Sequence, residues 1–438
     1  MMNVDKLFEK ALAKGLSDVQ VFVNNSTQLS IEVFAGELDK YEIADTSSMT
    51  IRGVYKGKMG SYVTEIMEDE LIDGIVDHLI KNASIIDSLD DAIIYGGDKE
   101  YKAVEGLFNE DLSKLEVAKK IATVKELDKQ FHEANPLVTV AETMYSETTR
   151  SVMIQNTLGL KLFNKVNSAY IGGSVIVKDD KDQRTAFDLE ISNNFDDFHV
   201  DTLASEVVKD AVSQLGAGPI PSGNYEIVFD RSALATLLSA FGNVFSADAV
   251  HKGFSLLKGK LGEEVGSSLV TIVDDPFLKK SSRSRSFDDE GVATKYKELI
   301  SKGVLKTYLH NLVTAKKDGV EPTGNGFGTT VAAVNLMLLP GTSTKELLLA
   351  SLENGVYITD VQGAHAGANP VSGDFSLQAS GFLVENGKIV KPVALITVAG
   401  NFIAMLKDVV LVGNDVKMSY YGITCPSVKV KSMPVAGK

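Results

Sequence analysis

The sequence predicts an α+β protein with mixed and antiparallel sheets, packed helices and a larger β-rich C-terminal domain. Helical and strand-like segments follow one another in a mixed order, whereas a doubly wound parallel sheet requires strict alternation of strand and helix. The chain has 438 residues, which suggests two or three domains at roughly 150 residues each. Two polar or glycine-rich stretches divide it, and we expect units at residues 1–90, 106–217 and 222–438.

The first unit is expected to begin and end with a helix. Residues 4–14 carry apolar side chains at helical spacing, and Gly15 ends the helix. Helical spacing returns at residues 68–83. The runs between the two helices are rich in Val, Ile, Thr and Tyr, which predicts strands at residues 19–23, 29–34, 48–55 and 58–66.

The second unit follows a mostly polar linker at residues 87–105. Its first helix must end before Pro136, because the residue before a proline disfavours the helical conformation. Residues 137–156 alternate well enough to predict a hairpin pair of strands. The remaining elements expected here are helices at 111–130 and 199–214, strands at 160–179 and 184–193, and a Gly/Pro-rich linker at 216–223.

The third unit is expected to be rich in β structure. It begins with a strand at residues 225–229, after which Asp230 offers its side chain as an N-cap to a helix at 232–245. The rest mixes strands with glycine-rich turns and contains one clear helix, at residues 344–354.

Composition excludes several classes of function. The formal net charge of −14 gives a surface that repels phosphate backbones and anionic lipid, so neither nucleic-acid nor membrane binding is expected. The single cysteine, Cys425, cannot form an intramolecular disulfide or a cysteine-cluster zinc site. The N-terminus has no apolar signal core, and no run approaches about 18 apolar residues. We therefore expect a cytoplasmic protein.

Common catalytic motifs are incomplete in this sequence. The glycine-rich stretch at residues 323–328 lacks the Lys-Ser/Thr ending of a phosphate loop, and no Gly-x-Ser-x-Gly elbow occurs. FHEANP at residues 131–136 starts like a metal-binding helix, but Pro136 interrupts its next turn and no second histidine follows. His251, in VFSADAVHKGF, is the remaining candidate, although a catalytic zinc needs about three protein ligands.

Long blocks of the chain, in the correct order, resemble the TldD/PmbA family. They include FAGELDKYEIADTSSMTIRGVYKGKMGSY in the first unit, HKGFSLLKGKLGEEVGSSLVTIVDDP from His251 onward, SRSFDDEGVATKYKELISKGVLKTYLHNLVTAKKDG, and GANPVSGDFSLQASGFLVENGKIVKPV. The resemblance covers nearly the whole chain and is closer to the PmbA (TldE) branch than to the TldD branch.

The resemblance implies a peptidase assembly. TldD-type chains carry a metal-binding His-Glu-x-x-x-His motif and act on peptides or unfolded proteins, and PmbA-type chains pair with them. With His251 on the second histidine, Ser246 takes the place of the first histidine and Ala247 that of the glutamate. We therefore expect no cofactor in this chain and zinc in a TldD-type partner. Cys425 precedes Pro426 and does not match the Cys-Gly-Lys of the TldD branch.

Three further clusters are candidates for binding. The acids of FDDEG, residues 287–291, are expected in a solvated loop or against a substrate amine, because neighbouring side chains on an extended strand point in alternate directions. The basic run at 281–286 is a candidate partner for these acids or for another protein. Asn369, Gly373 and Asp374 match the family's glycine-rich pattern, and we expect them to line a peptide cavity; tight turns joining two strands are the alternative.

Three functions remain open from the sequence. The chain is a non-catalytic subunit paired with a TldD-like chain, a peptidase active alone as a homodimer, or a peptide-binding module without chemistry. In the first of these, an extended peptide would add to a sheet edge through main-chain hydrogen bonds.

Overall fold

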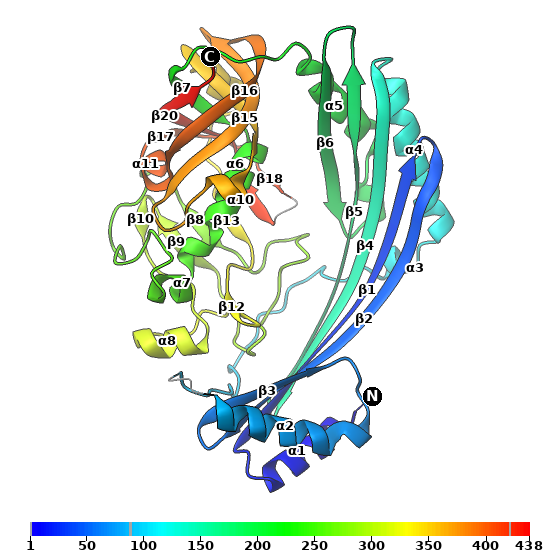
Figure 1. The fold of residues 1–438 in the computed structure, drawn as a ribbon, viewed down its shortest axis with the longest axis vertical. Helices are drawn as coiled ribbons and strands as arrows, with labels where there is room; N and C mark the ends of the chain where they lie inside the picture. The colour runs from blue at the N-terminus through cyan, green and yellow to red at the C-terminus, as the bar shows by residue number, and fades with distance from the viewer. Residues whose placement is uncertain (1, 87–89, 420–421) are drawn as a thin grey trace.

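A computed structural model describes residues 2–86, 90–419 and 422–438 and confirms the α+β class (Figure 1). Within these ranges the strands form three six-stranded sheets and a two-stranded ribbon. Figure 1 shows one sheet of long strands on the right and a C-terminal lobe on the left, with the N-terminus below and the C-terminus above. No helix in the described ranges is long and apolar enough to cross a membrane.

The first sheet is antiparallel, in the order β3-β2-β1-β4-β5-β6, and joins strands from the predicted first and second units. Its strands are β1 (Asp18–Phe34), β2 (Glu37–Tyr55), β3 (Lys58–Thr64), β4 (Val138–Asn156), β5 (Lys161–Lys178) and β6 (Gln183–Ser192).

Two strand predictions for this sheet were wrong in the same way. Residues 137–156 do not form a hairpin, because β4 runs through them as one strand of 19 residues. The strands expected at 19–23 and 29–34 are one continuous strand, β1. In both cases the polar middle of the segment keeps the alternation of a strand and contains no Gly or Pro to turn the chain.

Helices cover one face of the first sheet at its two ends. Val19, Val21 and Val23 of β1 belong to one apolar core, and Leu29, Ile31 and Val33 to another. Asn25 and Thr27 occupy the same face between them, so the middle of the sheet is polar. The helices of the first core are α1 (Val4–Ala13) and α2 (Ile72–Ile85), with the 3-10 turn η1 (Asp69–Leu71). Those at the second core are α3 (Glu110–Lys114), α4 (Val117–Ala134) and α5 (Val200–Ser213), with η2 (Phe195–Asp197).

The contact between α2 and β3 depends on Gly60. A Cβ atom at Gly60 would lie 2.0 Å from the backbone oxygen of Leu79, which cannot move without shifting α2. We expect Gly60→Ala to lower the free energy of unfolding by about 1–3 kcal/mol. Gly74 of the same helix is exposed and faces open space, so Gly74→Ala should raise it by about 0.4–1 kcal/mol. Urea unfolding of both variants checks the pair, and equal effects would contradict this packing.

The C-terminal lobe contains the largest apolar core. One sheet has the order β10-β9-β8-β13-β19-β18, and in the other β16 also pairs with β20, so that five strands close into a ring. The strands of the first are β8 (Ile272–Asp274), β9 (Lys297–Ser301), β10 (Val304–Leu305), β13 (Leu336–Leu338), β18 (Lys417–Met418) and β19 (Ile423–Cys425). Those of the second are β7 (Gly223–Phe229), β14 (Asn354–Gln362), β15 (Asp374–Glu385), β16 (Lys388–Asn401), β17 (Val409–Val412) and β20 (Val428–Ala436); the ribbon is β11 (Gly326–Phe327) and β12 (Thr330–Val331).

Short helices connect these strands. Asp230 caps the first of them as predicted, because its Oδ1 accepts the N–H of Ser232 at 3.0 Å. The helices are α6 (Arg231–Phe241), the 3-10 turn η3 (Gly242–Phe245), α7 (Ala247–His251), α8 (Leu312–Asp318), α9 (Lys345–Ala350), α10 (Ala364–Gly367) and α11 (Phe402–Lys407).

The predicted linker at 87–105 joins the first two units along the chain, and its side chains also form hydrogen bonds with the C-terminal lobe. Residues 87–89 lie outside the described ranges, and residues 90–109 contain no helix or strand. The Tyr101 hydroxyl donates to the carbonyl of Gly291 at 2.7 Å, and Asp98 accepts the N–H of Ala293 at 2.7 Å. Phe287 of the C-terminal lobe packs in an apolar cluster with residues of the first sheet. Residues 287–293 therefore lie at the junction of the two lobes.

Candidate functional site

Ser246 and Ala247, the positions assigned to the degenerate metal motif, begin α7 inside the C-terminal lobe. Ser246 is the N-cap of this helix, and its Oγ accepts the N–H of Ala249 at 3.4 Å. Both side chains are buried, and Ala247 belongs to the main apolar core. The local sequence explains this arrangement, since serine favours the N-cap and the alanine that follows fits a crowded core.

His251 lies at the other end of α7 and is hydrogen-bonded to Asp318. Its Nε2 is 2.7 Å from Oδ1 of Asp318, which ends α8. The other oxygen of Asp318 lies 4.0 Å from Nδ1 of His310, a buried atom without a hydrogen-bond partner. Burial lowers the pKa of His310 below its usual value, which favours a neutral ring. Asp318 thus lies between two imidazoles, and His251 fastens α7 to α8.

These residues do not fit a zinc ion. A zinc site needs three or four nitrogen, oxygen or sulfur donors that converge on one point. Ser246 Oγ serves the helix cap, Ala247 has no donor atom, and His251 Nε2 is held by Asp318. Across the described ranges, no three His, Cys, Asp or Glu side chains are grouped so as to hold a metal ion.

Asn369 and Gly373 lie in the turn before β15, and Asp374 is the first residue of that strand. The Asn369 side chain accepts the N–H of Val371 at 2.9 Å, and Gly373 adopts a φ of +85° that favours glycine. Asp374 is exposed and accepts a hydrogen bond from Asn401, which lowers the pKa of its carboxyl. The turn also contacts the segment after His251, since the Pro370 carbonyl accepts the N–H of Leu256 at 2.9 Å. The fold thus brings the two regions predicted from sequence close together.

Asp288 and Glu290 of FDDEG are not in a solvated loop, so that alternative was wrong for these two acids, whereas a contact with a substrate amine stays a prediction. Asp288 is 1% exposed and Glu290 is 5% exposed. Asp288 accepts the backbone N–H groups of Glu290, Val292 and Gly326, at 3.0, 3.0 and 2.8 Å. Glu290 accepts the N–H of Leu312 at the start of α8 and lies 3.9 Å from Arg52 of β2. Both acids therefore order loops at the junction between the lobes, which a linear pattern of charges does not reveal.

Asp288 gives the stability of the protein a pH dependence. Burial and the nearby charge of Glu290 raise the pKa of Asp288 to about 8, whereas an unfolded aspartate titrates near about 3.9. Between these values the native protein keeps a proton that the unfolded chain has released, so this group makes stability fall as pH rises. The free energy of unfolding should drop more between pH 5 and pH 8 in the wild type than in Asp288→Asn, as measured by urea unfolding. An equal drop would contradict the assignment.

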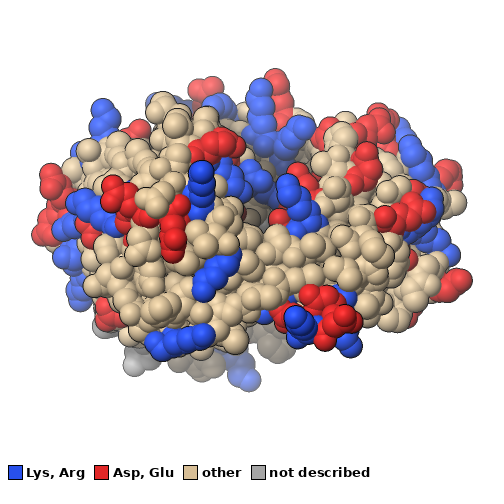
Figure 2. Space-filling model, turned by 90° about the horizontal axis from the view of Figure 1, so that it is seen from above, with Lys and Arg blue, Asp and Glu red and all other residues tan. Residues whose placement is uncertain are grey.

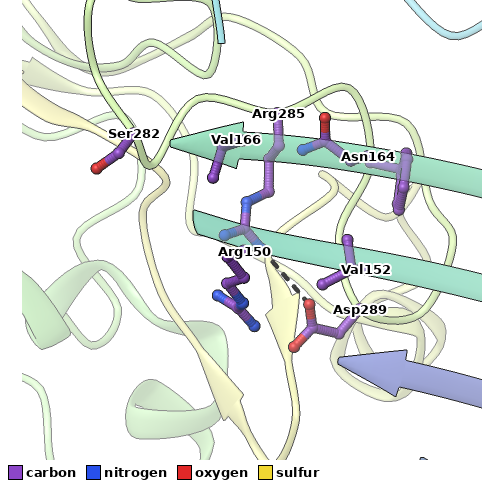
Figure 3. Close-up of a pocket in the computed structure, with 8 residues that line it drawn as sticks. Arg150, Val152, Asn164, Val166, Ser282, Arg285 and Asp289 are labelled. Atoms are coloured by element: carbon purple, nitrogen blue, oxygen red, sulfur yellow. Dashed lines mark hydrogen bonds and ion pairs between the residues drawn. The ribbon is translucent and has the colours of Figure 1, made fainter. Parts of the chain in front are cut away.

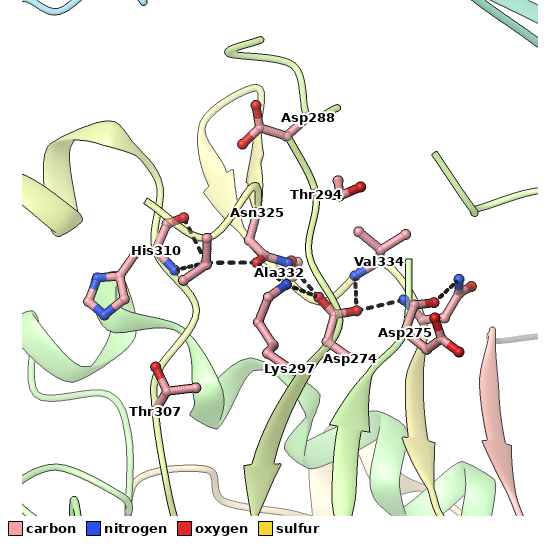
Figure 4. A network of polar contacts seen from close by, with 12 residues as sticks. Asp274, Asp275, Asp288, Thr294, Lys297, Thr307, His310, Asn325, Ala332 and Val334 are labelled. Carbon is pink, nitrogen blue, oxygen red and sulfur yellow. Dashed lines mark hydrogen bonds and ion pairs between the residues drawn. The ribbon is translucent and has the colours of Figure 1, made fainter. Parts of the chain in front are cut away.

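A buried polar network missed by the sequence analysis lies at the ends of β8 and β9 (Figure 4). The Lys297 ammonium donates to Asp274 and to Asn325, both at 2.9 Å, and Asn325 donates to Asp274 at 2.8 Å. Asp274 also accepts two backbone N–H groups, from Val334 and Asn335. Burial lowers the pKa of Lys297, and the charge of Asp274 opposes that shift. Because each charge in this network has partners, its role is to hold loops of the lobe together.

A small pocket lies between the first sheet and the C-terminal lobe (Figure 3). Arg150 of β4 and Arg285 of the 281–286 run line it from the two lobes, with Asp289 beside Arg285. Arg285 lies 3.4 Å from Asp289, which confirms one of the two pairings expected for the basic run. The rest of the wall is formed by Val152, Asn164, Val166, Ser282 and Phe287. Arg150 was not singled out in the sequence, because only the fold places it opposite Arg285.

The comparisons with known proteins agree with this fold. Sequence models of three domains match in order: PmbA/TldA metallopeptidase domain 1 at residues 19–84, its central domain at 110–215 and its C-terminal domain at 222–437. Metalloprotease MJ0996 of Methanocaldococcus jannaschii is 26% identical over 98% of this chain and 97% of its own length. Metalloprotease PmbA of Escherichia coli O157:H7 is 24% identical, over 98% of this chain and 94% of its own.

Solved structures show the same likeness over the full length. The Thermotoga maritima protein TM0727, described as a proposed modulator of a DNA gyrase, is 37% identical with a TM-score of 0.93, covering 99% of both chains. TldE from Thermococcus kodakarensis, at 21% identity, shares the fold with a TM-score of 0.89, covering 99% of this chain and 100% of its own. The three domain matches and these full-length likenesses show that the chain belongs to the PmbA/TldD metallopeptidase family.

Proposed function

We propose that this chain is a PmbA/TldE-like, non-catalytic subunit of a metallopeptidase that acts on peptides or unfolded proteins. The proposal rests mainly on the residues found at the three positions of the metal-binding motif. A helix cap, a buried methyl group and a histidine hydrogen-bonded to Asp318 stand at Ser246, Ala247 and His251, where the catalytic branch has two metal ligands and a general base. A TldD-type partner would hold the zinc ion, which supplies the hydrolytic chemistry.

This chain would contribute walls and main-chain contacts for the substrate. Asn369, Gly373 and Asp374 are the proposed substrate-binding residues, because their turn adjoins the segment that follows His251. A free strand edge is also available. β3 pairs only with residues 49–55 of β2, so the outer edge of residues 37–48 has no partner strand in the described part of the chain. Such an edge can accept an extended peptide through backbone hydrogen bonds, with little dependence on sequence.

The proposal is tested by reconstitution with a TldD-type chain from the same cell. The pure protein should leave an unfolded peptide intact, and cleavage should appear when the two chains are combined. Replacement of a metal-binding histidine in the partner should abolish that cleavage, whereas Ser246→Ala in this chain should leave it unchanged. Cleavage by the pure protein would instead support a peptidase active alone as a homodimer. Peptide binding without cleavage, even with the partner present, would support a binding module.

A further inference from the structure

The pocket between the lobes contains two arginines and one carboxylate, and only Arg285 is paired with that carboxylate. Arg150 donates through Nε to the Asn24 side chain at 2.6 Å, and no acidic group in the described ranges forms an ion pair with it. Arg285 has a long ion pair of 3.4 Å with Asp289, and its guanidinium carbon lies 4.9 Å from the centre of the Phe327 ring. Two cations in a partly buried site repel each other unless an anion lies between them. The pocket is therefore electrostatically suited to a negative ligand.

The charged residues that line the pocket are mainly positive, whereas the whole molecule has a formal net charge of −14. The positive charge of Arg150 lowers the pKa of Arg285 further, beyond the larger effect of burial. Viewed from above, the molecule is hollowed between its two lobes, and Lys and Arg side chains stand beside the hollow together with some Asp and Glu side chains (Figure 2). Within the pocket, Arg150 and Arg285 outnumber Asp289, so its lining is positive in spite of the overall negative charge of the molecule.

The shape of the pocket restricts the ligand. The pocket is partly open to solvent and has a cavity volume of about 20 Å³, which suits a small group at its inner end. A carboxylate meets this limit better than a phosphate does, and its planar pair of oxygens matches the fork of donors on a guanidinium. Val152, Val166 and Phe287 give the wall an apolar part that can contact the rest of a peptide residue.

We propose that Arg150 and Arg285 bind the α-carboxylate at the C-terminus of the peptide substrate. This rests on the proposed function, because it takes a peptide as the ligand. The two arginines come from different lobes, so a carboxylate bound between them also ties the first sheet to the C-terminal lobe. Recognition of a chain end is independent of the peptide's sequence and would fix the position of the peptide relative to the partner's catalytic centre.

The test compares two forms of one unstructured peptide, N-acetyl-tetraalanyl-leucine with a free C-terminal carboxylate and the same peptide as its amide. Binding to the full-length chain is measured by calorimetry at low ionic strength. The free acid should bind at least about tenfold more tightly, since hydrogen bonds to charged groups are worth more than neutral ones. Arg150→Gln should remove that difference. Arg184→Gln, which changes an arginine paired with Asp182 elsewhere on the first sheet, should keep it.

Further arms separate the possible outcomes. An amide peptide with a glutamate near its end identifies a side-chain carboxylate as the source if it binds as tightly as the free acid. Equal affinities of acid and amide for the wild type, or no binding of either at millimolar concentration, overturn the inference without any variant. Cleavage of the same peptides by the complex with a TldD-type partner is measured in parallel. If the complex cleaves the free-acid and amide peptides equally well, the carboxylate site is rejected and the proposed function stands. If the pure chain cleaves the peptides by itself, the proposed non-catalytic function is rejected and the carboxylate site stands.

Discussion

Replacing Ala247 with glutamate, the residue of the catalytic motif, is expected to destabilise the protein by more than about 3 kcal/mol. Ala247 is 0% exposed and belongs to the main apolar core. A glutamate there adds volume to a packed interior and buries a charge without a partner, and each change is costly by itself. The free energy of unfolding, from urea titration followed by circular dichroism, checks the result.

Phe254→Glu is the matched control for this substitution. It introduces the same side chain seven positions further along, where Phe254 is 59% exposed. The change in stability there should stay within about 0.5 kcal/mol. If Ala247→Glu were tolerated as well as Phe254→Glu, the interior at position 247 would have room for a glutamate. Tight packing at the start of α7 could then not account for the absence of the motif glutamate.

Replacing Lys297 with methionine should destabilise the protein by about 3–5 kcal/mol, because it leaves Asp274 buried without its cation. Asp274 is 0% exposed, and the Lys297 side chain is 10% exposed. Methionine keeps most of the side-chain volume, so the loss is electrostatic rather than a cavity. The same urea titration measures the effect.

Lys114→Met provides the comparison for a solvated ion pair. Lys114 lies 2.6 Å from Glu110, and both side chains are largely exposed. Its replacement should change stability little, because water screens the pair. A loss as small for Lys297→Met would show that water reaches Asp274 and that the network is not the support of the lobe inferred here.

Local patterns predicted much of the fold. Asp230 caps α6 as its position after a strand indicates, and the predicted helix at 199–214 is α5. The long strands were divided incorrectly, because Asn25 and Thr27 look like the polar middle of a turn. Their polarity instead reflects a stretch of sheet between two separate helical layers. The lack of Gly and Pro in these segments was the local signal of a continuous strand, whereas the two cores that the strand joins are set by tertiary structure.

The candidate site could be predicted only in part. The sequence alone shows that the metal motif is incomplete, because Ser246 and Ala247 stand where the motif has a histidine and a glutamate and only His251 matches it. The partner of His251 could not be found, since Asp318 lies 67 residues away. Arg150 and Arg285 meet only when the first sheet packs on the C-terminal lobe, so their pocket depends on tertiary structure alone.

Zinc analysis of the pure protein tests the central claim most directly. The chain is produced without its partner in zinc-supplemented medium, purified without chelator and measured by mass spectrometry of its metals. The account predicts no stoichiometric zinc, and the same content in His251→Ala as in the wild type. One tightly bound zinc ion per chain that is lost in His251→Ala would contradict it, because the histidine held by Asp318 would then be a metal ligand.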